Sequence, residues 1–180
     1  QFVAAGGLPD IVIASAGVSV GTLTEHAEDA DAFARVMHTN VLGMVHTFQP
    51  FVAPMRAAGA GTLVGIASVA GVRGLPGAGA YSASKAAEVQ LARVLAIENG
   101  EHGIRCNVVN PDAIFQGSNL WSPELKEQRA KAHGITVEGL EDFYRQRNLL
   151  KETISGDDVA QAVLFLAGPR SAKTTGAMLP

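Results

Sequence analysis

The chain has 180 residues, of which 47% are hydrophobic and 17% charged, so length and composition fit one globular domain with a sizeable core. A net charge of −3 and a pI near 5.9 give no electrostatic basis for binding nucleic acid or an anionic membrane, and no apolar run reaches the roughly 18 residues of a membrane span. The single Cys106 cannot form an internal disulfide, so we expect a cytoplasmic protein without nucleic-acid or membrane partners.

The first part of the chain predicts two strands with a long helix between them. Residues 10–17 (DIVIASAG) are β-branched and end in glycine, which is typical of a buried parallel strand. Over residues 28–56, apolar side chains recur at helical spacing with Asn40 as a polar member of the stripe, and we expect the two prolines near the end to kink or stop this helix. Residues 62–68 (TLVGIAS) predict the second strand.

The second part predicts a buried helix, another strand, a flap and a last helix. Residues 81–99 are apolar on nearly all sides, so we expect this helix to be buried on two sides. Residues 104–111 (IRCNVVNP) predict a continuous apolar strand, and residues 112–153 are polar and predict a mobile helical flap. The last helix should begin near Ser155 or Asp157, either of which can act as its N-cap.

Strands that alternate with helices predict parallel βαβ units with right-handed crossovers. The expected fold class is therefore α/β, with a doubly wound, Rossmann-like parallel sheet. Both ends look cut, because the chain opens with Gln1 a few residues before a core strand and residues 174–180 (TTGAMLP) stop where another strand begins. We expect a fold that is incomplete at both ends.

Ligands of such sheets bind beyond the carboxyl ends of the strands. Here those ends are residues 15–17, Ser68 and residues 111–114, and Tyr81 opens the helix after the second strand. Ser68 and Tyr81 can therefore face one cleft, and Asn40 can point to the same place.

The stretch YSASK at residues 81–85 allows two chemistries. On a helix Tyr81 and Lys85 share a face, so a cationic lysine can lower the pKa of the phenol and let it pass a proton at neutral pH. Ser82 and Lys85 have the Ser-x-x-Lys spacing of β-lactamases, but the Ser-Asp-Asn and Lys-Thr-Gly companions of that motif are missing. A hydrolase is the remote alternative.

These residues resemble the short-chain dehydrogenase/reductase family. Asn40, Ser68, Tyr81 and Lys85 match its four catalytic positions, with Tyr81 13 positions after Ser68 and Ser68 28 positions after Asn40. The resemblance covers the whole chain, including GDDVAQAVLFL and TTG near its end. It implies that residues 1–180 are the C-terminal two-thirds of one Rossmann-like dehydrogenase domain, with the flap at about residues 112–153.

The resemblance implies an NAD- or NADP-dependent oxidoreductase that interconverts a small alcohol and its carbonyl compound without a metal. Tyr81 would be the general acid/base, Lys85 would lower its pKa and hold the nicotinamide ribose, Ser68 would bind the substrate oxygen, and Asn40 would hold a water linking Lys85 to solvent. It further implies a homodimer or homotetramer that assembles through the helices near 28–56 and 80–99. The residues expected to contact the cofactor are Ser15, Ala16, Gly17, Tyr81, Lys85, Pro111 and Ile114.

The sequence departs from the family pattern where the cofactor should bind. The glycine-rich TGxxxGxG turn and the residue that selects NAD or NADP are absent, Ala14 and Ser15 replace the usual Asn-Asn, Asp112 replaces the glycine of Pro-Gly, and Gln116 stands where threonine is frequent. A non-catalytic oligomerising fragment or pseudoenzyme is therefore the alternative. From about residue 81 the chain resembles the dehydrogenase part of bifunctional rhamnulose-phosphate aldolase/alcohol dehydrogenases, so a chimera is also open.

Several other residues have plainer interpretations. Asn40 taken alone fits a core asparagine, and Cys106 fits a small buried hydrophobe. Trp121 either caps a substrate pocket or packs under the flap. The charged run ELKEQRAK at residues 124–131 suits a solvated helix face, and the five scattered histidines lack metal-ligand spacing.

Overall fold

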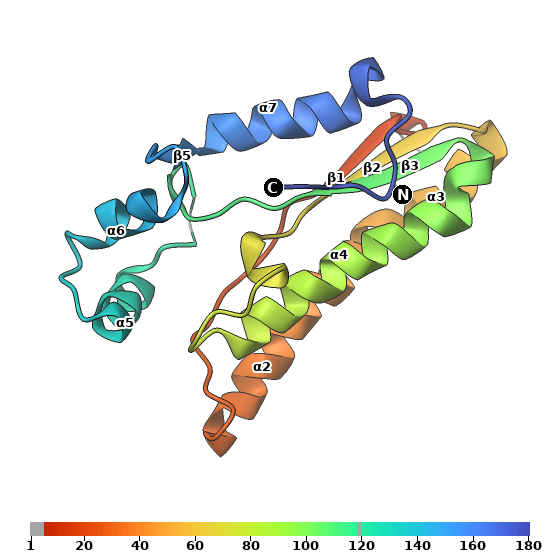
Figure 1. Cartoon of the computed structure of the whole chain (residues 1–180). Helices are drawn as coiled ribbons and strands as arrows, with labels where there is room; N and C mark the ends of the chain where they lie inside the picture. Colours follow the sequence, from red (N-terminus) through yellow and green to blue (C-terminus); the bar gives the residue numbers. More distant parts are fainter. Residues whose placement is uncertain (1–5, 119) are drawn as a thin grey trace.

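The computed structural model describes residues 6–118 and 120–180, and its centre is a sheet of four parallel strands (Figure 1). The strands are β1 (Ile11–Ala14), β2 (Gly61–Ile66), β3 (Ile104–Val109) and β6 (Met178–Leu179), in the order β1-β2-β3-β6. Ile11 lies opposite Thr62, and Gly61 lies opposite Ile104. The predicted strands and the α/β class are confirmed.

Helices cover both faces of this sheet (Figure 1). One face carries α3 (Gly43–Ala58) and α4 (Gly79–Asn99), with α2 (Ala30–Met37) packed on α4, and the other carries α7 (Gly156–Ala167). Successive strand residues point to opposite faces, so Leu63 joins the core under α3 and α4 whereas Val64 joins the core under α7. The sheet is therefore doubly wound.

Strand β1 is buried on one face only, which corrects the expectation of a fully buried strand. Val12 packs into the core beneath α3, but Ile11 and Ile13 on the opposite face are 44% and 46% exposed. The reason is that α7 packs mainly against β2 and β3.

The long helix does not end at its prolines, so that expectation is wrong, whereas a kink there stays a prediction. Helix α3 runs through Pro50 and Pro54 to Ala58 and ends where Gly59 adopts a left-handed conformation at φ 70°. Each proline frees a backbone carbonyl one turn earlier, but His46 and Pro50, which carry those carbonyls, are exposed to water. The irregularity lies upstream instead, in a π-helical stretch at His38–Leu42 that joins α2 to α3.

Helix α4 is buried as predicted, but the expectation that it is apolar on nearly all sides is wrong. Its buried residues are Ala80, Ser84, Lys85, Glu88, Val89, Ala92, Ala96 and Asn99. It packs against β3, α2, the π-helical stretch and η3 (Val69–Gly71), the turn that follows β2. Two of these buried side chains, Lys85 and Glu88, are charged.

The predicted flap contains two helices and two short strands: β4 (Ile114–Gln116), α5 (Pro123–His133), α6 (Leu140–Arg147) and β5 (Ile154–Ser155). It has its own apolar cluster, in which Trp121 stacks on Phe115 with ring centroids 4.2 Å apart and meets the edge of Tyr144 at 5.3 Å. Of the two interpretations of Trp121, packing within the flap is therefore the one that the structure supports.

Helix α7 is held at both ends. Ser155 is its N-cap, and the Ser155 Oγ accepts a hydrogen bond from Asp158 N at 3.3 Å while Asp158 accepts one from Ser155 N at 2.9 Å. At the other end Arg105 of β3 donates to the carbonyl of Leu166 at 2.8 Å, a favourable place for a cation. Across the described ranges, no helix is long and apolar enough to cross a membrane.

Candidate active site

The segments that follow β2 and β3 meet at the carboxyl edge of the sheet. Ser68 Oγ accepts a hydrogen bond from Ala70 N at 3.1 Å and donates a long one to the Pro111 carbonyl at 3.4 Å. Val69 N donates to the same carbonyl at 3.1 Å. Two predicted site residues, Ser68 and Pro111, are thereby joined, and Ser68 is buried.

Asn40 is fully buried and links the loop after β1 to α4. Its Oδ1 accepts from Val18 N at 2.8 Å, and its Nδ2 donates to the Val18 carbonyl at 3.0 Å and to Ser84 Oγ at 2.9 Å. The π-helical stretch places this side chain, and such irregular turns often occur at functional sites. A core asparagine with satisfied hydrogen bonds describes these contacts, and its part in holding a water stays a prediction.

Lys85 lies one turn from Tyr81 on α4 and reaches the end of β2 and the loop after β1. Its Nζ donates to the carbonyl of Ile66, the last residue of β2, at 2.8 Å, and lies 5.7 Å from the centre of the Tyr81 ring. A Cβ added at Gly17, after β1, would lie 3.3 Å from this Nζ and 3.5 Å from the Asn40 Oδ1. Gly17, Asn40, Tyr81 and Lys85 therefore share one site.

Glu88 belongs to this site and was not expected from the sequence. Its two carboxylate oxygens lie 3.0 and 2.9 Å from Lys85 Nζ, and the two side chains are only 3% and 5% exposed. Burial raises the pKa of Glu88 to about 7, although the positive charge and hydrogen bonds of Lys85 act in the opposite direction. The i, i+3 spacing was the one available signal, and it was hidden in a helix that otherwise looked apolar.

The expectation that Lys85 lowers the pKa of Tyr81 is not met. Burial raises the pKa of Tyr81 above its ordinary value; hydrogen bonding with Ser68 lowers it, the charge of Glu88 raises it, and the charge of Arg129 lowers it. The ammonium of Lys85 is turned to Ile66 and Glu88 instead. Tyr81 and Ser68 are nevertheless neighbours, as predicted.

Arg129 is a second site residue that sequence reasoning missed. It lies in the charged run on α5 that we expected to be solvated, but it is buried and donates to the carbonyl of Pro76 at 2.9 Å. Beside it, the side chain of Gln128 approaches Gly21 so closely that an added Cβ would lie 2.1 Å away. The flap is thereby docked on the loops that follow β1 and β2.

The remaining predicted cofactor residues lie at strand ends, with one exception. Ser15 and Ala16 are exposed immediately after β1, beside Gly17. Ile114 lies farther along, in β4, where it pairs with Ile154 of β5. The structure therefore groups Ser15, Ala16 and Gly17 but places Ile114 in the small sheet of the flap.

The Ser-x-x-Lys pair is not assembled. Ser82 Oγ accepts a hydrogen bond from Leu75 N at 3.4 Å, whereas Lys85 Nζ donates to Ile66 and Glu88. The structure therefore does not support the hypothesis of a Ser-x-x-Lys hydrolase. In the part of the chain that the structure describes, no group of three or more His, Cys, Asp or Glu could hold a metal ion.

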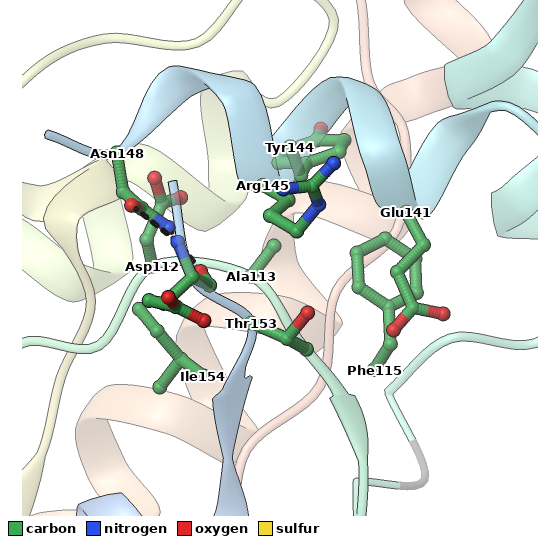
Figure 2. Close-up of a pocket in the computed structure, with 10 residues that line it drawn as sticks. Asp112, Ala113, Phe115, Glu141, Tyr144, Arg145, Asn148, Thr153 and Ile154 are labelled. Carbon is green, nitrogen blue, oxygen red and sulfur yellow. Dashed lines mark hydrogen bonds between the residues drawn. The ribbon is translucent and has the colours of Figure 1, made fainter. Parts of the chain in front are cut away.

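Two cavities border the flap. The smaller, shown in Figure 2, lies between α6 and the β4–β5 pair and is lined by residues such as Phe115, Tyr144 and Thr153. The larger, of about 550 Å³, reaches from Val69 and Pro111 to α7 and β6. It adjoins Ser68 through Val69. Asp112, where glycine is usual, pairs with Arg73 at 3.4 Å on its wall.

Comparison with known proteins identifies relatives of this chain. The family profile described as "Enoyl-(Acyl carrier protein) reductase" matches residues 1–180. The chain is 33% identical over 180 aligned residues to 2-(R)-hydroxypropyl-CoM dehydrogenase of Xanthobacter autotrophicus, covering 96% of this chain and 65% of that protein. It is 44% identical over 119 residues to the uncharacterized oxidoreductase YuxG of Bacillus subtilis, covering 66% of this chain and 17% of YuxG.

A solved structure titled "ElxO with NADP Bound" superposes with a TM-score of 0.81 at 26% identity, over 99% of this chain and 67% of that one. The fold is thus that of a dinucleotide-linked oxidoreductase class, and the chain belongs to the short-chain dehydrogenase/reductase family. The chain spans about two-thirds of the length of the Xanthobacter relative and a much smaller part of YuxG.

The buried carboxyl of Glu88 should make stability depend on pH. Because its pKa is raised from 4.5 to about 7 on folding, the folded chain holds this proton more tightly, and the stabilisation is full below pH 4.5 and lost as pH rises through about 7. Denaturant unfolding measured across this window should show the wild type losing stability relative to Glu88→Gln. Glu98→Gln, an exposed change on the same helix, is the control. Parallel wild-type and Glu88→Gln curves would contradict the assignment.

Proposed function

We propose that the protein is an NAD- or NADP-dependent oxidoreductase that interconverts a small alcohol and its carbonyl compound, with Tyr81 as general acid/base. The observation that carries this proposal is that the Tyr81 phenol lies next to the Ser68 hydroxyl. On the same helix as Tyr81, the Lys85 ammonium donates a hydrogen bond to the carbonyl of Ile66 at the end of β2. A partly buried phenol beside a hydroxyl can both orient a substrate oxygen and exchange a proton with it.

The chain's own residues divide the work as follows. A bound dinucleotide would supply or accept the hydride. In reduction, the Tyr81 phenol gives its proton to the substrate oxygen, and in oxidation it takes that proton back. The Ser68 hydroxyl holds the same oxygen. Lys85 provides the positive charge near the negative charge that develops there, and Asn40 fixes the loop after β1 against α4.

Features of the site fit the nicotinamide end of such a cofactor. Gly17 leaves space beside Lys85 that a Cβ would narrow. Asn110 follows β3 on the wall of the larger cavity, and its buried amide has no hydrogen-bond partner among residues 6–118 and 120–180. A buried amide without a partner is costly, so a ligand with hydrogen-bonding groups suits this position. We place the small-molecule substrate beside Ser68 and Tyr81, where the larger cavity adjoins Ser68 through Val69.

Tyr81→Phe tests the proposed chemistry in the intact gene product. The change removes one hydroxyl and keeps the ring, so we expect the fold to persist and hydride transfer to fall by about 10²–10⁴-fold. The measurement is the rate of dinucleotide reduction or oxidation with a panel of small alcohols and carbonyl compounds.

Ser82→Ala is the matched control, because it removes a hydroxyl from the next residue of the same helix and should change the rate little. Loss of activity in Ser82→Ala with a fully active Tyr81→Phe would instead favour the Ser-x-x-Lys chemistry. An intact protein without any oxidoreductase activity would favour the pseudoenzyme.

Dinucleotide binding by the 180 residues alone should be weak. The glycine-rich turn that lets a pyrophosphate approach a helix N-terminus is not in this sequence, and VRGLPGAGA follows β2 and so lies in the wrong place to replace it. Calorimetry with NAD and NADP checks this expectation, and micromolar affinity would overturn it.

The protein should associate into a homodimer or homotetramer. The helices expected at the interface expose Phe33, Leu42, Val94 and Ile97, and exposed apolar side chains favour burial between copies. Light scattering at micromolar concentration measures the mass in solution, and a monomer would count against this proposal.

A further inference from the structure

Helix α4 buries a complete ion pair within the proposed active site. Glu88 holds Lys85 Nζ with both carboxylate oxygens, at 3.0 and 2.9 Å, one turn along the same helix. Both side chains are almost wholly removed from solvent. The pair is not an exposed surface contact of the kind that contributes little.

The pair uses most of the hydrogen-bonding capacity of Lys85. An ammonium has three N–H donors; the Ile66 carbonyl takes one and the Glu88 carboxylate takes at least one more. At most one donor is left for any other partner. Glu88 therefore decides where the charge of Lys85 lies relative to Tyr81.

Burying two charges is costly, and an apolar residue at position 88 would fill the helix interface at lower cost. The rest of the buried surface of α4 is suited to this, because alanine and valine neighbour Glu88 on the helix. A buried lysine without a counter-ion would be costlier still. A buried Glu88 is therefore explained if the positive charge of Lys85 is required in the site, because the carboxylate balances that charge.

We propose that Glu88 is a positioning residue that holds Lys85 in place, so that Lys85 acts on Tyr81 as one half of a Lys85–Glu88 pair rather than as a lone cation. This inference rests on the proposed function, since it gives Lys85 a task in the same site. Glu88 acts through Lys85 and touches no reacting atom.

The charges around Tyr81 give the proposal a measurable consequence. Glu88 on α4 raises the pKa of Tyr81, Arg129 on α5 lowers it, and Lys85 lies 5.7 Å from the ring centre. Removing the negative charge of Glu88 leaves Lys85 and Arg129 as uncompensated cations near the phenol. Glu88→Gln should therefore lower the pKa of Tyr81.

The first experiment needs no activity. The chain has two tyrosines, so Tyr144→Phe leaves Tyr81 as the one phenol that can be followed by ultraviolet absorbance. In that background, the Tyr81 phenol of the Glu88→Gln variant should lose its proton at lower pH than in the parent. In the Glu98→Gln variant, the phenol should lose its proton at the same pH as in the parent. Circular dichroism at each pH defines the range in which the variants remain folded. Equal titrations of the two variants would overturn the proposal.

The second experiment uses the intact gene product and follows kcat/KM for alcohol oxidation against pH. The rate should rise as Tyr81 loses its proton, and Glu88→Gln should move this rise to lower pH while Glu98→Gln leaves it in place. A purely structural Glu88 would lower the amount of folded enzyme without moving the profile. An active enzyme whose Glu88→Gln profile coincides with the Glu98→Gln profile would therefore refute the inference and leave the proposed function standing.

The reverse outcome is also distinguishable. If the phenol titration shifts with Glu88→Gln but the intact wild-type protein transfers no hydride, the proposed function fails, whereas the electrostatic link between Glu88 and Tyr81, on which the inference depends, stands. If the Tyr144→Phe variant unfolds at alkaline pH, the pH dependence of kcat/KM in the intact gene product is the deciding measurement.

Discussion

The side-chain amide of Asn40, which is buried, holds together the segments at the carboxyl edge of the sheet. Beyond the carboxyl ends of parallel strands no ladder bonds remain, so side chains must fix the segments that leave the sheet. Asn40 does this with three hydrogen bonds, to both backbone groups of Val18 and to Ser84 Oγ. As a result, the loop after β1 is held next to helix α4, and Gly17 lies close to the Lys85 side chain.

The backbone of α4 is held just as firmly on its other side. A Cβ at Gly71 would lie 2.6 Å from the backbone carbonyl carbon of Lys85, so η3 and α4 pack backbone against backbone. With its main chain fixed, Lys85 can place its charge only within the reach of its side chain. The Ile66 carbonyl and Glu88 lie within that reach. The electrostatics of the site are therefore a consequence of close backbone packing.

The elements that sequence analysis predicted correctly are those whose signals are local. The β-branched runs predicted β1, β2 and β3, and Ser155 was one of the two residues expected to cap the start of α7. The spacing in YSASK predicted that Tyr81 and Lys85 lie on one face of a helix. The errors concern contacts between distant segments. The π-helical stretch, the exposure of Ile13, and the burial of Arg129 depend on how neighbouring elements dock. Glu88 was missed for the same reason, because its meaning depends on which face of α4 is buried.

Docking of the flap places the positive charge of Arg129 near Tyr81. Arg129 is held against the Pro76 carbonyl, in the loop that leads into α4, and from there its charge lowers the pKa of the phenol. On the neighbouring loop, the end of the Gln128 side chain lies against Gly21 and would have to shift to admit a Cβ there. Any movement that carries α5 away from these loops removes a cation from the vicinity of Tyr81 and leaves the opposing charge of Glu88 in place. The charges that surround the phenol therefore depend on a contact between two distant segments of the chain, the flap and the loop before α4.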